Sequence, residues 1–345
     1  MSDISSKVTR RRALKGALKS ALTFSGAGMA LAGAGLGFSQ PARAATKFRV
    51  LTNFFAEPGH GGIYQAKVTG LYEKAGLDVE IKQGGPQING MQLLTGGEAD
   101  ILMGSGIGAI ASVQNGAPVV VIMPTYQFDM QCIVTRPEVP SVAALKGKTI
   151  LVSTLGRGSY WLWMKDKFGF TDDQVAPYTG NYQPFIQDPT MGLGGVATSE
   201  PYRIDQAGVK NRYFLLAKEG YPPYGYPMLT MRPTIAKDRD AVARWVRATL
   251  EGWKSFLADP APGLKAIKAD RTDVTDGFLE YSVKTIRDLG AAQGGEVKTN
   301  GMGTMNDARW QELADFMLKA GLLKPTTDWK AAYTTEFVKD LKIMP

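Results

Sequence analysis

The residues best able to do chemistry are the single histidine, His60, and the single cysteine, Cys132. A zinc site needs three or four Cys, His or carboxylate ligands, and these two lie far apart in the chain. A Ser-His-Asp or Cys-His triad would have to use His60, which lies in a glycine-rich loop, and the chain has no G-x-S-x-G elbow. Cys132 lies in an apolar run, which is typical of a small buried residue. We therefore expect no catalytic residue, no metal site and no cofactor.

A second chemical pattern lies at residues 104–109, which imitate the G-x-G-x-x-A loop of nucleotide-binding proteins. That loop needs an acidic residue at the end of the next strand, whereas the apolar run 119–123 ends in Pro124. A nucleotide-binding sensor is therefore a weak alternative, and it predicts cofactor absorbance in the purified protein.

The elements that would position these residues alternate between strand-like and helix-like runs. Strands are expected at 47–53, 78–82, 100–103 and 119–123, and helices at 61–75, 86–94 and 107–115. This βαβα order predicts a doubly wound α/β sheet. The run 119–123 is wholly apolar, as expected of a strand buried on both faces.

The same rhythm restarts in the middle of the chain. Strands are expected at 148–153, 175–178, 195–199 and 213–217, with helices around Trp161 and at 184–191. The remainder is mostly helical, with an amphipathic helix at 240–257 and another capped by Asn306. We therefore predict lobe 1 from residues 45–135 plus 228–345 and an inserted lobe 2 from residues 136–227, with chain crossings near 130–140 and 220–230. Open α/β sheets bind ligands at the carboxyl ends of their strands, so a cleft between the lobes is the expected site.

Six short runs carry a family resemblance in their order. They read PGHGGIYQA at 58–66, GLY at 70–72, AGLDV at 75–79, GEAD at 97–100, LKGK at 145–148 and TSEPY at 198–202. Together they resemble the periplasmic substrate-binding proteins of ABC importers, in the branch grouped with thiamine-pyrimidine, nitrate, sulfonate and taurine binders. The resemblance implies a two-lobe periplasmic binding protein fold of type II, with a doubly wound sheet and flanking helices in each lobe. It also implies a monomer that binds a small molecule and delivers it to an ABC permease of the inner membrane, without making or breaking a bond.

Lobe 1 is expected to contact the ligand through its first two strand-to-helix loops. The expected ligand-binding residues are Asn53, Glu57, His60, Tyr64, Ser105 and Tyr126. His60 lies where the first strand leads into the first helix, whose free backbone N–H groups can hold an anion or a carbonyl. Alternatively, His60 is a turn histidine that caps this helix.

Lobe 2 is expected to contribute aromatic side chains and a carboxylate. The expected ligand-binding residues are Arg157, Tyr160, Trp161, Asn181, Glu200 and Tyr202. Trp161 is the residue expected to stack on a planar ligand, and core packing is the alternative. Glu200 precedes Pro201 at an expected strand end, where its carboxylate would accept hydrogen bonds from ligand N–H groups. Otherwise Glu200 pairs with Arg157 or caps the next helix.

The aromatic residues and Glu200 favour a flat nitrogenous ring, such as a thiamine-pyrimidine precursor, over nitrate or a sulfonate. An anion receptor would rely on backbone N–H groups and arginine. The alternative class is an enzyme of pyrimidine metabolism, because the superfamily includes the fungal-type thiamine pyrimidine synthase. The His- and Cys-rich iron motif of that enzyme has no counterpart in a chain with one histidine and one cysteine.

The first 44 residues predict export to the periplasm. The run TRRRALK at 9–15 resembles a twin-arginine signal, and a weakly apolar run at 20–39 and a small-x-small cleavage site at 42–44 follow it. The apolar run is diluted with glycine, which disfavours the alternative of a retained membrane anchor. Residues 1–44 contain seven Lys/Arg and one Asp, so six of the eight net positive charges belong to the signal. The remainder is nearly neutral, and no nucleic-acid partner is expected.

Overall fold

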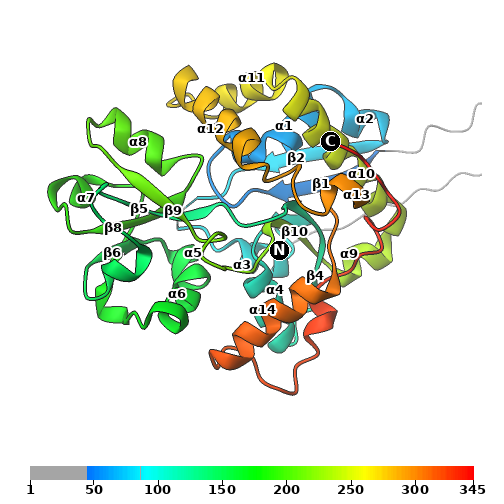
Figure 1. Ribbon diagram of the computed structural model, residues 1–345. Coiled ribbons are helices and arrows are strands. Elements are labelled where there is room, and N and C mark those ends of the chain that lie inside the picture. Colours follow the sequence, from blue (N-terminus) through cyan, green and yellow to red (C-terminus); the bar gives the residue numbers. More distant parts are fainter. Residues whose placement is uncertain (1–44, 86) are drawn as a thin grey trace, which may run out of the picture. The chain divides into compact units, whose positions relative to one another are not determined.

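The computed structural model describes residues 45–85 and 87–345, and the expected export signal lies outside this range. The strands form two five-stranded mixed sheets (Figure 1). The first has the order β2-β1-β3-β10-β4, with β1 (Thr46–Leu51), β2 (Leu77–Lys82), β3 (Ile101–Met103), β4 (Val119–Tyr126) and β10 (Gly225–Met231). The second has the order β7-β6-β8-β5-β9, with β5 (Gln131–Thr135), β6 (Ile150–Val152), β7 (Val175–Pro177), β8 (Gly192–Val196) and β9 (Arg212–Leu215). The expected α/β architecture is confirmed.

Helices follow most of the strands and cover both sheets. They are α1 (Gly61–Val68), α2 (Leu71–Lys74), α3 (Gly90–Thr95), α4 (Gly106–Gln114), α5 (Thr154–Arg157), α6 (Tyr160–Phe168), α7 (Gln183–Gln187), α8 (Glu200–Gln206), α9 (Arg232–Lys237), α10 (Arg239–Ala258), α11 (Ala261–Asp270), α12 (Asp276–Leu289), α13 (Val297–Asn300) and α14 (Asp307–Lys319). Figure 1 shows α6 and α8 on opposite faces of the second sheet. Among the described residues, no helix combines the length and apolar character that a membrane span requires.

The sheets differ from the expectation in two strands that return antiparallel. Strand β10 lies between β3 and β4 and runs antiparallel to both. Strand β5 pairs antiparallel with β8 and β9, so it belongs to the second sheet. The expected boundary after residue 135 is therefore wrong for β5, and the first crossing lies between Tyr126 and Gln131. The residues around Cys132 are as apolar as those of β4. Composition alone therefore does not show where the chain crosses from the first sheet to the second.

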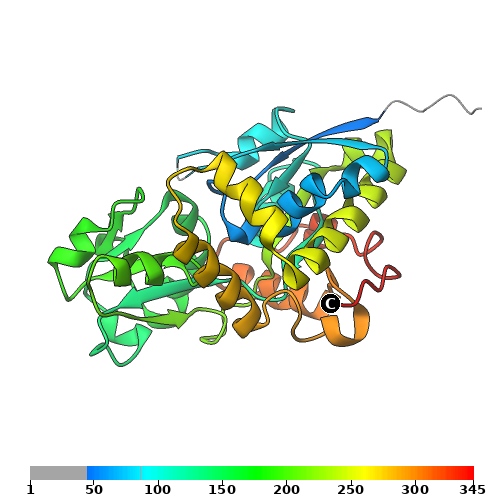
Figure 2. The same ribbon diagram turned by 90° about the horizontal axis from the view of Figure 1, so that it is seen from above.

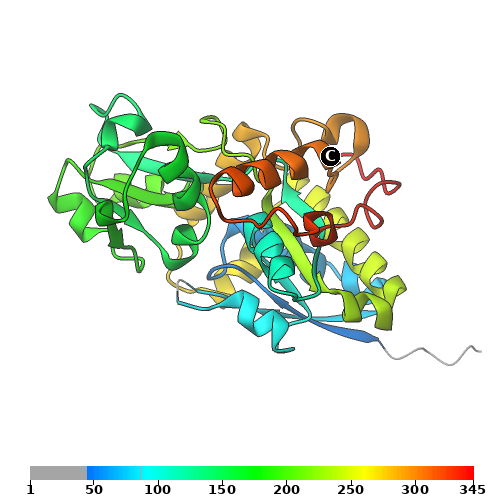
Figure 3. The same ribbon diagram turned by 90° about the horizontal axis from the view of Figure 1, so that it is seen from below.

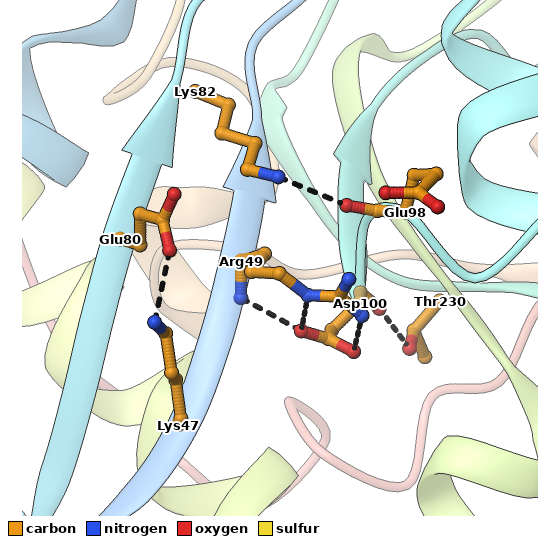
Figure 4. Close-up of polar contacts among 7 residues, drawn as sticks. All are labelled: Lys47, Arg49, Glu80, Lys82, Glu98, Asp100 and Thr230. Atoms are coloured by element: carbon orange, nitrogen blue, oxygen red, sulfur yellow. Dashed lines mark hydrogen bonds and ion pairs between the residues drawn. The ribbon is translucent and has the colours of Figure 1, made fainter.

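Polar contacts tie three strands of the first sheet together (Figure 4). The Arg49 guanidinium on β1 donates to both oxygens of Asp100, at 3.0 and 2.9 Å. The backbone N–H of Arg49 donates to the same carboxylate at 2.8 Å. Thr230 on β10 donates its hydroxyl to the Asp100 carbonyl oxygen at 2.7 Å. Because Asp100 immediately precedes β3, these bonds help to set the register of β1, β3 and β10.

The helices on the two sides of the first sheet pack differently. Figure 2 shows α11 beside α1, and α10 packs closely on α1 through glycines. The Cβ of an alanine at Gly62 would lie 2.2 Å from Trp253 Cγ, so the two helices touch where a side chain is missing. On the other side α14 lies against α4 (Figure 3). The expected cap of α14 is confirmed, because Asn306 Oδ1 accepts the Arg309 N–H at 2.9 Å.

Candidate functional site

A cavity of about 370 Å³ opens between segments that belong to the two sheets. Five of the expected ligand-binding residues line it, namely Asn53, Glu57, Ser105, Tyr160 and Glu200. Asn53 and Glu57 follow β1, and Ser105 follows β3. Tyr160 begins α6, and Glu200 begins α8 after β8. The cavity therefore lies where strands of both sheets lead into their next segments, as the expected cleft would.

Glu200 is held at the start of α8 by hydrogen bonds within the second sheet. Its Oε2 accepts the Val196 N–H at 2.7 Å, and its Oε1 accepts the Tyr178 hydroxyl at 3.1 Å. Only 7% of the residue is exposed, and this burial raises the pKa of the carboxyl group. β8 ends at Val196, three residues before the expected strand end at residue 199, and Glu200 lies four positions after Val196. The bonds orient the carboxylate without neutralising it.

Glu57 is the second buried carboxyl group of the cavity, and 3% of the residue is exposed. Burial is the first cause that raises its pKa, to about 7, and repulsion by Glu200 is the next. The side chains of Arg271 and Arg203 act in the opposite direction. Near neutral pH, Glu57 is therefore poised between its protonated and ionised forms.

His60 does not line the cavity, although it supports a residue that does. Its Nε2 lies 2.8 Å from Asn53 Oδ1, so the imidazole donates this hydrogen bond and holds the Asn53 side chain. The ring is fully buried, and this burial lowers its pKa to about 3. A neutral, buried His60 therefore acts on Asn53, and the cavity lining does not support the predicted direct contact of His60 with a ligand. Ser105 lines the cavity and also caps α4, because its Oγ accepts the Gly108 N–H at 3.0 Å.

Trp161 lies in the core of the second sheet, so the expected stacking platform is wrong. Its Nε1–H donates to Asp172 Oδ1 at 2.9 Å, and its ring packs on Phe170 with centroids 5.8 Å apart. The residue is 1% exposed. The neighbouring Tyr160 is the aromatic residue that α6 presents to the cavity, where it lies against Gly194. On a helix with aromatic residues at successive positions, the sequence does not tell which one faces the ligand.

Five other expected residues also lie away from the cavity lining. Tyr64 donates its hydroxyl to Asp270 at 2.9 Å, and Tyr126 donates to the Gly59 carbonyl oxygen at 3.3 Å. Tyr202 packs on Phe278 and Tyr281. Arg157 and Asn181 are exposed. The hydroxyls of Tyr64 and Tyr126 and the ring of Tyr202 are used within the fold, and none of the five residues lines the cavity.

Several lining residues were missed by the sequence interpretation. Tyr178 follows β7, Gln131 begins β5, and Tyr226 lies in β10. Tyr226 has a positive φ of 47°, which is strained for a residue with a side chain. Both β10 and β5 went unrecognised as strands, so Tyr226 and Gln131 could not be placed at a sheet edge. The aromatic run at residues 221–226 was the available signal.

The glycines of β8 allow the second sheet to approach the cavity closely. A Cβ at Gly194 would lie 2.0 Å from the Tyr160 hydroxyl oxygen, and one at Gly195 would lie 2.6 Å from Glu200 Cγ. Both glycines line the cavity. They therefore let Tyr160 and Glu200 lie flat against the strand.

The charge of the lining is one-sided. It includes the two carboxyl groups of Glu57 and Glu200, while the residues lining the cavity in the described part of the chain include no lysine, arginine or histidine. Within residues 45–85 and 87–345, no three His, Cys, Asp or Glu side chains group so that they could hold a metal ion. The cavity is thus built to bind through carboxylates, hydroxyls, amides and apolar surface.

We expect Trp161→Phe to affect stability and not binding. The phenyl ring keeps the contact with Phe170 but removes the N–H that Asp172 accepts. The loss of this bond should lower the free energy of unfolding by about 1–2 kcal/mol, measured by chemical denaturation. Isothermal titration should give an unchanged dissociation constant for any cavity ligand, and a weakened one would restore Trp161 to the site.

Comparisons with known proteins agree with this architecture. The sequence profile described as NMT1/THI5 like matches residues 57–262. A search of curated protein sequences found no match.

The solved alkanesulfonate-binding protein SsuA of Xanthomonas axonopodis pv. citri, bound to MOPS, is 15% identical with a TM-score of 0.60, over 86% of this chain and 99% of that chain. The periplasmic nitrate-binding protein NrtA of Synechocystis PCC 6803 is 13% identical with a TM-score of 0.62, over 86% and 88%. A Candida albicans protein with the generic periplasmic binding protein fold is 16% identical with a TM-score of 0.58, over 84% and 96%. These likenesses show that the chain has the periplasmic binding protein fold.

Proposed function

The chain belongs to the NMT1/THI5 like family, and from this premise we propose that it is the solute-binding component of an ABC importer. It binds a small organic nutrient in the cavity between the two sheets and delivers it to a permease of the inner membrane. The observation that carries this proposal is the cavity itself, about 370 Å³ in volume and lined by residues of both sheets. A cleft of this size, apolar with a few convergent polar groups, is typical of a small-molecule site.

We propose a planar nitrogenous ring, such as a thiamine-pyrimidine precursor, as the ligand. Tyr160, Tyr178 and Tyr226 supply aromatic surface, and Glu57 and Glu200 supply acceptors for amino or ring N–H groups. Sulfonate and nitrate, which the names of two similar structures mention, are anions and would meet two carboxyl groups without an opposing cation in the lining. The charge of the cavity therefore supports an N–H donor over an anion.

Ligand capture would involve a relative movement of the two sheets. The chain crosses between them at residues 127–130 and again at 216–224, where β9 leads to β10. Because cavity residues come from both sides of these crossings, a hinge there would open and close the site. The protein would act as a monomer in this cycle.

A mass-spectrometric measurement tests the function directly. The protein purified from its native host should release an unaltered small molecule with ring nitrogen on denaturation. A thermal-shift screen of pyrimidines, sulfonates and aromatic acids should give stabilisation, which reaches about 2.7 kcal/mol at a ligand concentration 100 times the dissociation constant. Chemical conversion of the molecule on incubation would support the rival enzyme of pyrimidine metabolism instead.

Export by the twin-arginine route is a separate proposal with its own test. The double substitution of Arg10 and Arg11 by lysine keeps the charge of the signal but removes the paired arginines. We expect full-length precursor to accumulate in the cytoplasm, and immunoblots of fractionated cells would measure it. Undiminished periplasmic recovery would show that the general secretory route carries the protein.

A further inference from the structure

We infer that the ligand carries a positively charged nitrogen, which Glu57 and Glu200 hold together from the two sheets, and that its binding releases a proton from Glu57. The inference rests on the proposed function, because it names the charge of the molecule that this cavity takes. It goes further than a flat ring with N–H groups, since a neutral heterocycle would satisfy that description.

The two carboxyl groups reach the cavity from separate parts of the fold. Glu57 follows β1 of the first sheet, whereas Glu200 begins α8 after β8 of the second. Each is at least nine-tenths buried, and each raises the energy of the other's ionised form. With both ionised, mutual repulsion opposes the approach of the two sheets. A cation between them converts this repulsion into attraction.

Glu57 is the partner that lacks a hydrogen bond. In the described part of the chain the Glu57 carboxyl group accepts no hydrogen bond, whereas the Glu200 carboxylate accepts from Val196 and Tyr178. A buried, ionised carboxylate without a partner is costly, so below about pH 7 the group keeps its proton until a counter-charge arrives. The cavity is the side from which such a charge can come.

The charged groups around Glu57 do not supply this counter-charge by contact. Arg271 pairs with Asp273, with Nε 3.1 Å from Oδ1. Arg203 donates to the Ser199 hydroxyl and lies over the Phe278 ring at 4.7 Å. Neither arginine lines the cavity.

Among the described residues, three further titratable groups close to Glu57 carry no charge near neutral pH. They are Tyr126 on β4 and Tyr226 on β10, whose pKa values burial raises well above the ordinary value, and His60, whose pKa burial lowers to about 3. The proton that Glu57 loses when a cation binds therefore passes to the solvent and not to a neighbouring side chain. Burial and Glu200 together keep the pKa of Glu57 at about 7, so the exchange takes place near neutral pH.

Three aromatic probes that differ in charge test the inference. Benzamidine is a cation at neutral pH, benzamide is its neutral counterpart, and benzenesulfonate is an anion. Isothermal titration with the protein without its export signal should give a preference for benzamidine over benzamide of about 10- to 100-fold, as expected for a charge-assisted hydrogen bond. Benzenesulfonate should not bind. Equal or tighter binding of benzamide would overturn the inference.

Matched glutamate variants assign the preference to the pair. Glu57→Gln and Glu200→Gln keep the shape of the side chains, and each should reduce the benzamidine-over-benzamide preference about tenfold or more. Glu312→Gln, on the exposed surface of α14, is the control and should leave the preference unchanged. Circular dichroism checks that each variant is folded. If Glu57→Gln retains the full preference, Glu57 does not hold the cation.

The pH dependence tests the released proton. A cation binds to the ionised form of Glu57, so benzamidine affinity should rise with pH up to about 7 and then level off. Below pH 7 it should fall by up to about tenfold per pH unit, which corresponds to one linked proton. Titration at pH 6 in two buffers of different ionisation enthalpy should report close to one proton released, and Glu57→Gln should abolish the release. A flat profile would refute the proton exchange.

These outcomes separate the inference from the proposed function. If the native ligand recovered by mass spectrometry is neutral, or if benzamide binds best, the cation inference fails while the solute-binding function stands. If neither a native ligand nor a probe occupies the cavity, the solute-binding function itself fails.

Discussion

Replacing Gly195 with alanine is expected to weaken ligand binding about 100-fold. The new Cβ would lie 2.6 Å from Glu200 Cγ and 2.7 Å from Oε2, so the carboxylate must leave its bond with the Val196 N–H. Displacing a buried charged partner by this route costs about 2–5 kcal/mol, which corresponds to such a loss of affinity. Isothermal titration with the best ligand of the thermal-shift screen would measure it.

Gly192→Ala is the matched control on the same strand. Its Cβ would meet the end of the Leu145 side chain at 2.9 Å, and Gly192 does not line the cavity. We expect a small loss of stability with ligand affinity retained. If Gly195→Ala binds normally while remaining folded, the position of Glu200 does not determine binding.

The largest expected effect on stability comes from Gly62→Ala, where α1 meets α10. Alanine favours a helix over glycine by about 1 kcal/mol, which alone would stabilise the protein. Here the Cβ would enter the Trp253 ring at 2.2 Å, and Trp253 is fully buried. Since the indole has no free space to move into, we expect a net loss of about 3 kcal/mol in the free energy of unfolding, measured by urea denaturation.

A control on the exposed face of the same helix separates packing from helix propensity. Lys67→Ala changes a solvent-facing residue of α1 and should alter the free energy of unfolding by less than about 0.5 kcal/mol. A stabilised Gly62→Ala protein would mean that α1 and α10 can separate without cost, contrary to the packing described here.

The spacing of apolar residues and the capping residues predicted those elements that depend on their own sequence alone. The buried strand around residues 119–123, the amphipathic helix near 240–257 and the Asn306 cap were recognised because apolar spacing and capping chemistry are local properties. Strand β10 was not recognised, because Pro227 and its neighbours resemble a loop and its stability comes from β3 and β4 on either side. Pairing partners more than 100 residues away leave no trace in a short window of sequence.

The sequence could predict which loops form the candidate site, but not which of their side chains face the cavity. Asn53, Glu57 and Glu200 lie at the cavity because they follow strands, which is a topological property. Trp161 and Tyr160 are adjacent on one helix, and only the packing of Trp161 on Phe170 decides which of them faces the ligand. That decision depends on the rotation of α6 against its sheet, which the aromatic pattern does not specify.

The place of β10 also sets an order of events during synthesis on the ribosome. All strands of the second sheet lie within residues 131–215, so that sheet can pair as soon as they have emerged. The first sheet must wait, because β3 and β4 have no strand between them until residues 225–231 arrive. At roughly 5–20 residues per second, the gap of about 100 residues after β4 leaves those two edges unpaired for about 5–20 s. During that interval the apolar β4 is a template for pairing with other chains, so the nascent protein depends on chaperones more than its finished fold would indicate.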